Sequence, residues 1–63
     1  MNAKVTYTQK WLGQILKHTE YRELDDERFG EEAFNIRYAL FEDPLVQSVE
    51  IQVEIEQGKW MEF

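Results

Sequence analysis

Cysteine is missing from this chain of 63 residues, and histidine, proline and glycine are scarce, with one, one and three copies. The missing thiols exclude disulfides, thiolate metal clusters and cysteine nucleophiles. No apolar run approaches the roughly 18 residues of a membrane-spanning helix, and no signal peptide is visible at the N-terminus. With 43% hydrophobic and 14% aromatic residues, the chain is too apolar for a disordered acidic tail. We therefore expect one small cytoplasmic domain, residues 1–63.

The sequence offers little that could carry catalysis. The three glycines are isolated, so there is no phosphate-binding loop, and His18 is the only histidine. His18, Glu20 and Glu23 could approach one metal ion, but this spacing is common by chance. The simpler interpretation is that His18 ends a helix. We expect no enzymatic activity, no cofactor and no metal.

The N-terminal half predicts a strand, a helix and a loop. Residues 4–8 alternate apolar and β-branched side chains, which favours a short strand. Thr8 is then a suitable N-cap for a helix over residues 9–18, whose apolar face holds Trp11, Leu12, Ile15 and Leu16. Residues 19–33 carry seven acids and few apolar residues, which indicates a solvated loop.

Residues 34–41 fit two patterns. As a strand, they place Phe34, Ile36, Tyr38 and Leu40 on one face; as a helix continuing from residue 26, they contribute to a stripe with Phe29 and Ala33. Periodicity alone does not separate the two. We prefer the strand, because Gly30 interrupts the helix and a clear strand follows.

The strongest pattern in the chain is the alternation over residues 48–56. Val49, Ile51, Val53 and Ile55 are expected to be buried, with the intervening Glu50, Glu54 and Glu56 exposed. A tight turn at residues 57–58 then leads to a strand over residues 59–63. The predicted fold is α+β: a short strand, one helix, an acidic loop and a three-stranded antiparallel β-meander.

A chain this short has little margin of stability. It is expected either to pair with a copy of itself or a partner, or to build a dense core from its aromatic residues. The aromatic residues available for such a core are Trp11, Phe29, Phe34, Phe41, Trp60 and Phe63.

Charge is divided unevenly along the sequence. Residues 1–18 carry a charge of +3, and residues 19–63 carry −9. The surplus of acidic residues after residue 18 disfavours direct binding to nucleic acid, because the phosphates would be repelled. It favours a basic partner, even though acids that alternate along a strand are usually no more than a solvated surface. The candidate partner-binding residues are Glu20, Glu23, Asp25, Asp26, Glu27, Glu31, Glu32, Glu50, Glu54 and Glu56.

In size, acidity and lack of cysteine and of an active site, the chain resembles the small phage-encoded inhibitors of host defence. These include anti-CRISPR proteins, anti-restriction proteins and inhibitors of uracil-DNA glycosylase, some of which are acidic DNA mimics. The resemblance rests on composition and on no motif. It implies an inhibitor in the host cytoplasm that occupies the basic DNA-binding surface of a nucleic-acid-binding protein, with aromatic anchors such as Tyr21 or Phe29. The alternative is a structural or regulatory protein that self-associates, for example as a homodimer, through a sheet edge. Neither hypothesis involves binding to a membrane.

Overall fold

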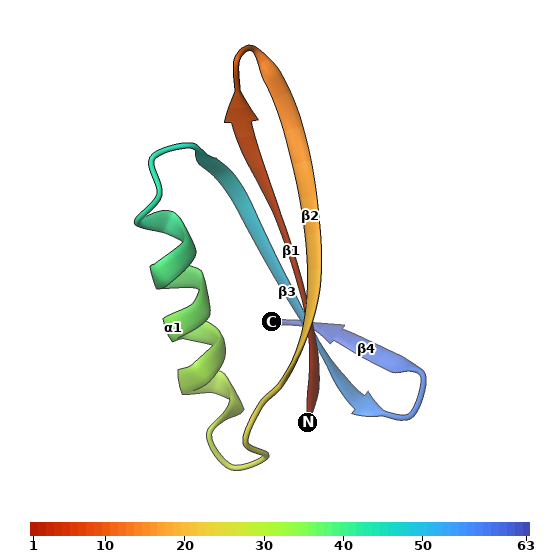
Figure 1. Ribbon diagram of the computed structural model, residues 1–63. Helices are drawn as coiled ribbons and strands as arrows, with labels where there is room; N and C mark the ends of the chain where they lie inside the picture. Colours follow the sequence, from red (N-terminus) through yellow and green to blue (C-terminus); the bar gives the residue numbers. More distant parts are fainter.

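The computed structural model describes residues 1–63 as four antiparallel strands and one helix (Figure 1). The elements are β1 (Asn2–Trp11), β2 (Gln14–Glu23), α1 (Phe29–Phe41), β3 (Val46–Glu56) and β4 (Lys59–Glu62). The strand order in the sheet is β2-β1-β3-β4, so β1 lies between β2 and β3. The helix α1 is neither long nor apolar enough to cross a bilayer.

The α+β class is confirmed, but the predicted order of elements is wrong. Residues 9–18, predicted to be a helix, form the end of β1, a turn and the start of β2. Leu12 and Gly13 both have positive φ, 49° and 78°. This pair is characteristic of the two-residue type I′ turn that joins twisted antiparallel strands. Thr8 is therefore not a helix cap, and its hydroxyl lies 2.7 Å from the hydroxyl of Ser48 on β3.

The predicted acidic loop is also wrong in extent, since β2 continues to Glu23 and α1 begins at Phe29. Residues 34–41 belong to α1, so the preferred strand is wrong and the helical stripe is correct. Ala33 and Ile36 are buried in this stripe, and Phe29 and Leu40 pack against the core beside them. Gly30 is tolerated in the first turn of α1, where a β-carbon would lie 3.3 Å from the Phe63 ring.

The C-terminal half agrees better with the prediction. The strand over residues 48–56 corresponds to β3, and the turn at residues 57–58 leads to β4 as expected. The three-stranded meander is wrong, however, because β3 pairs with β1 on one side and β4 on the other. The chain reaches β3 from β2 through α1, which lies along β3 on one face of the sheet (Figure 1).

The core is aliphatic and lies between α1 and the sheet. Nine hydrophobic residues are buried, and none of them is aromatic, so the predicted aromatic core is wrong. The buried residues are Ala3, Val5, Leu24, Ala33, Ile36, Val46, Val49, Ile51 and Val53.

Burial on β3 follows the predicted alternation for most of its length. Val49, Ile51 and Val53 are buried, but Ile55 is 51% exposed. A register shift between Glu54 and Glu56 interrupts the pairing of β3 with β4 at this point. Glu50 and Glu56 are exposed as predicted, whereas Glu54 is half-buried.

The two faces of the sheet differ in cover. We call the face beneath α1 the helix side and the opposite face the open side. Paired residues on adjacent strands share a face, so Glu20 opposite Val5 lies on the helix side and Tyr21 opposite Lys4 lies on the open side. No residue of β2 is buried on either face.

Candidate protein-binding site

The structure gathers seven of the ten candidate carboxylates at one end of the molecule. They come from the end of β2, the loop to α1, the first turn of α1 and the end of β3, and they line three neighbouring hollows. We call this group the acidic end: Glu23, Asp25, Asp26, Glu27, Glu32, Glu54 and Glu56.

Two carboxylates of the acidic end shape the loop before α1. Asp25 accepts a hydrogen bond from the amide of Glu27 at 2.8 Å, and its own amide donates to Glu32 at 2.7 Å. These bonds satisfy amides in the turn where α1 begins, a position at which negative charge also suits the helix dipole. The acids of this segment therefore have a structural role in addition to any role in binding.

Glu54 joins three parts of the chain. Its carboxylate accepts hydrogen bonds from the Gly58 amide in the β3–β4 turn and from the Asn2 side chain on β1, each at 3.0 Å. The Gly58 amide, assisted by Asn2, lowers the pKa of Glu54 below its ordinary value, because both bonds stabilise the ionised form.

Cationic groups contact two further acids of the acidic end. The amino group of Met1 donates to Asp26 at 2.7 Å, and this bond raises the pKa of the amine. Lys59 lies 3.4 Å from Glu56. Glu23 and Glu27 have no side-chain hydrogen bond or ion pair within the molecule. Their charges are therefore the most available to a partner.

The other three candidate residues lie outside this group. Glu20 is on the helix side, paired with Arg22 at 2.9 Å. Glu31 is paired with Arg28 at 3.1 Å, and the hydrogen bond between them raises the pKa of Arg28. Glu50 stands opposite Thr6 in the middle of the sheet. The three glutamates expected to be exposed along residues 50–56 thus do not form one free surface, because Glu54 is bonded and half-buried.

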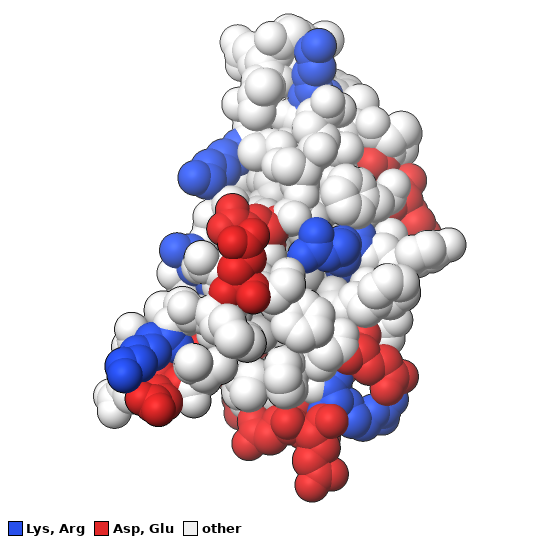
Figure 2. All heavy atoms as spheres, turned by 180° about the vertical axis from the view of Figure 1, so that it is seen from behind, with Lys and Arg blue, Asp and Glu red and all other residues white.

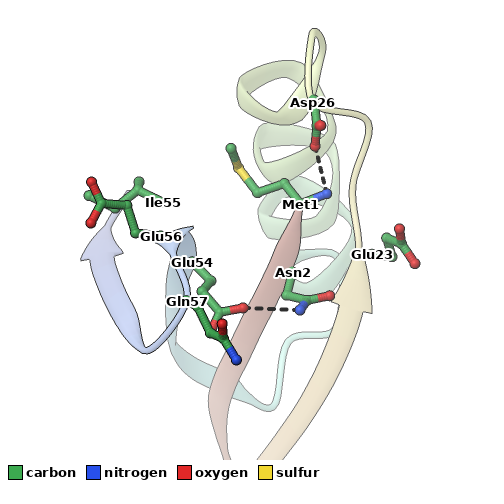
Figure 3. Close-up of a pocket in the computed structure, with 8 residues that line it drawn as sticks. All are labelled: Met1, Asn2, Glu23, Asp26, Glu54, Ile55, Glu56 and Gln57. Atoms are coloured by element: carbon green, nitrogen blue, oxygen red, sulfur yellow. Dashed lines mark hydrogen bonds and ion pairs between the residues drawn. The ribbon is translucent and has the colours of Figure 1, made fainter.

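One of the three hollows lies between the ends of β1, β2 and β3 and has a volume of about 530 Å³ (Figure 3). Two of its eight lining residues are hydrophobic, unlike the mainly apolar lining typical of small-molecule sites. Figure 3 shows the Asn2–Glu54 and Met1–Asp26 contacts within it, with Glu23 apart from both. Nowhere in the chain do three or more histidine or acidic side chains form a group suited to hold a metal ion. This geometry is suited to attracting cationic groups.

Two aromatic residues lie on the open side near the acidic end. Tyr21 on β2 and Trp60 on β4 meet edge to face across the two central strands, with ring centroids 6.4 Å apart. Tyr21 is 68% exposed. Of the two anchors suggested by the sequence, Tyr21 is available to a partner, whereas Phe29 packs against Phe63. From sequence, Trp60 was assigned to the core and was not identified as the aromatic residue that contacts Tyr21.

The remaining charge is arranged along the length of the molecule. Figure 2 shows acidic side chains at the lower end, in the middle and at the upper right of the view, with lysine and arginine among them and at the upper tip. The upper end is the tip of the β1–β2 hairpin, which carries Lys10 and Lys17 together with the exposed Trp11, Leu12 and Ile15. The strand β2 therefore carries Lys17 near the hairpin tip and Glu23 at its other end.

Comparison of this chain with protein-family models, with curated proteins and with solved structures finds no match, so the functional argument depends on its own geometry.

Proposed function

We propose that the protein is a non-catalytic binding module of the cytoplasm whose acidic end occupies the basic surface of a nucleic-acid-binding protein and thereby inhibits it. The observation that carries the proposal is the convergence of seven carboxylates from separate segments of the chain. Such a surface steers a basic partner into contact and sets its orientation.

The aromatic pair gives this surface a means of holding its partner. Long-range charge mainly accelerates association, whereas affinity depends on a few well-packed anchors. Tyr21 and Trp60 lie on the open side, and Trp60 stands directly opposite Glu54 on the neighbouring strand. Carboxylates and aromatic rings therefore face the same direction at this end of the sheet.

The first step of the test is to identify a partner by its chemistry. The protein is immobilised and exposed to a bacterial lysate, and what it retains is eluted with salt, identified by mass and purified. The expected partner is a DNA-binding protein, and duplex DNA is expected to displace it. If no retained protein is displaced by duplex DNA, the proposal is wrong.

The second step compares two double variants that change net charge equally. The double variant Glu23→Lys with Glu27→Lys reverses the two unpaired charges of the acidic end. The matched control, Glu42→Lys with Glu50→Lys, reverses two exposed acids outside it. All four residues lack side-chain partners in the structure, so both variants are expected to remain folded.

We expect the first double variant to bind the purified partner at least about tenfold more weakly in low salt, mainly through slower association. We expect the control to remain within about threefold of the parent protein, and the difference to shrink as salt screens the charges. Equal losses in both variants would show that net charge, and not the acidic end, determines binding.

A further inference from the structure

The outer edge of β2 is a long strand edge without a partner. β2 is the outermost of the four strands, pairs with β1 alone over ten residues, and has no buried residue. The opposite edge of the sheet, β4, has only four residues. An exposed edge of this length is a template for pairing with another strand.

The hairpin turn determines which backbone groups of β2 point outward. Trp11 and Gln14 flank the two-residue turn and thus form a hydrogen-bonded pair. Because this pattern alternates along an antiparallel pair, the even-numbered residues of β2 bond to β1. The amides and carbonyls of the odd-numbered residues, from Ile15 to Glu23, consequently point away from the sheet.

A second copy of the chain can pair with this edge in several registers, which differ in overlap and in the side chains that they oppose. Two identical antiparallel strands meet about a two-fold axis, and paired residues must lie on the same face of the joint sheet. An axis at Lys17 or at Glu20 would place like charges directly opposite each other, which is destabilising. An axis at His18 would bring no unlike charges together, because Lys17 would face Thr19 and Glu20 would face Leu16. An axis at Tyr21 would pair Glu20 with Arg22 but would overlap over residues 19–23 alone.

An axis at Thr19 combines the longest overlap with two complementary pairs, while Leu16 then lies opposite Arg22 and Ile15 opposite Glu23. His18 then lies opposite Glu20 of the second copy, and Lys17 lies opposite Tyr21, whose ring can contact both the aliphatic stem and the charge. Each pair occurs twice. The overlap covers residues 15–23 and offers about ten backbone hydrogen bonds, a number typical of a specific interface.

Charge over the whole length of the strand supports the same arrangement. In this register the hairpin end of each copy, with Lys10 and Lys17, lies beside the acidic end of the other, with Glu23. The two copies thus lie side by side in opposite directions, so that the lysines near the hairpin tip of each copy lie near Glu23 of the other.

We propose that the protein forms a two-fold dimer in which the β2 edges pair antiparallel about Thr19, giving a continuous eight-stranded sheet with both helices on one face. This inference does not rest on the proposed function, because it concerns the strand edge and a second copy of the chain, but it places Tyr21 and Glu23 beside that second copy.

Single cysteines test both the dimer and its register, because the parent chain contains none. In the Thr19→Cys variant the two substituted residues would face each other across the axis with α-carbons about 5.5 Å apart, within reach of a disulfide. The Lys17→Cys variant is the matched control on the same exposed face. Its two substituted residues would be four positions apart along the strand, or about 14 Å, too far to be bridged.

The first measurement is sedimentation equilibrium of the parent chain. The expected mass is twice the 7.6 kDa of one chain. Under mild oxidation, Thr19→Cys should form a covalent dimer in most of the protein and Lys17→Cys should not. A mixture of Lys17→Cys and Tyr21→Cys should form mainly the mixed disulfide.

Three results would overturn the proposal. One is a monomer at millimolar protein concentration. Another is a dimer in which Thr19→Cys does not cross-link, which would point instead to the exposed aromatic residues Phe34, Tyr38 and Phe41 on α1. The third is equal cross-linking of all three single-cysteine variants, which would indicate random collision.

Discussion

Replacing Ile51 with alanine tests whether the small aliphatic core holds the fold together. Ile51 is completely buried in the middle of β3 and pairs with Val5, which is also completely buried. The substitution removes three carbon atoms, and at about 0.8 kcal/mol for each buried methylene the lost transfer free energy is about 2.4 kcal/mol. The cavity left behind adds to this cost, so the expected loss is about 2–4 kcal/mol.

That loss is large for a chain of this size. Domains are stable by roughly 0.05–0.15 kcal/mol per residue, which gives about 3–9 kcal/mol for the free energy of unfolding of 63 residues. The Ile51→Ala protein should therefore lose at least about a fifth, and up to all, of its free energy of unfolding. The matched control is Ile55→Ala, which removes the same atoms from the same strand at a site that is 51% exposed, and should cost less than about 1 kcal/mol.

Urea unfolding followed by circular dichroism measures both free energies of unfolding. All samples are compared at one protein concentration, because dimer formation would itself add stability. If Ile51→Ala costs no more than Ile55→Ala, then β3 is not the central strand of the core and the sheet order described here is wrong.

Three further predictions concern local features of the fold. Glu54→Gln should lower the melting temperature and Glu50→Gln, which removes no contact, should not. The pKa of Glu54 is lowered from its ordinary value of 4.5, so its contribution to stability is present above that value and is lost as pH falls through the lowered pKa. The melting temperatures of Glu54→Gln and of the parent chain should thus converge in acid. Leu12→Asn should raise the free energy of unfolding by about 1 kcal/mol, because leucine is strained at φ 49°, whereas Gln57→Asn in the other hairpin should give no such gain. Arg37→Gln should speed hydrogen exchange at the end of the chain, since Arg37 links α1 to the carbonyls of Val49 and Phe63 at 3.2 and 3.1 Å.

The C-terminal hairpin could be predicted because its pattern fits only one structure. Residues 48–56 alternate without interruption and end at a glycine turn, and strict alternation over nine residues has no helical equivalent. The same pattern did not reveal that β3 is a central strand, because pairing with β1 depends on contacts between distant parts of the chain. Nor did it show that Ile55 lies at a register shift between β3 and β4, where it is 51% exposed.

The strand predicted over residues 4–8 lies within β1, but residues 9–18 were mispredicted because their apolar residues fit both a helix and a hairpin. Trp11, Leu12, Ile15 and Leu16 share a helical face, but in the structure Leu12 lies in the two-residue turn with Gly13 and the other three lie on the strands beside it. The turn was hidden because leucine rarely adopts positive φ. Once residues 14–23 are a strand, α1 is the one element left to cover the sheet. The helical stripe through Ala33 and Ile36 then outweighs the small cost of Gly30.

The candidate site was predictable in composition but not in arrangement. The sequence showed an excess of acids after residue 19 and named Tyr21 as an anchor. Only the fold distinguishes acids with internal partners, such as Glu54, from unpaired ones, such as Glu23. It also separates Glu50 from the acidic end, because the strand carries that residue to the middle of the sheet.

The two proposals meet at the same end of β2, and this makes them mutually informative. In the proposed dimer, Glu23 and Tyr21 of each copy lie beside Ile15 and Lys17 of the other, so the dimer covers one of the unpaired charges and one of the aromatic anchors assigned to a basic partner. A chain held as a monomer should then bind that partner more tightly. Thr19→Pro is suited to do this, because the lost amide points outward from an edge strand, a position where proline is tolerated. If the Thr19→Pro monomer and the parent dimer bind the partner with equal affinity, the binding surface lies away from the β2 edge, toward Glu27 and the start of α1.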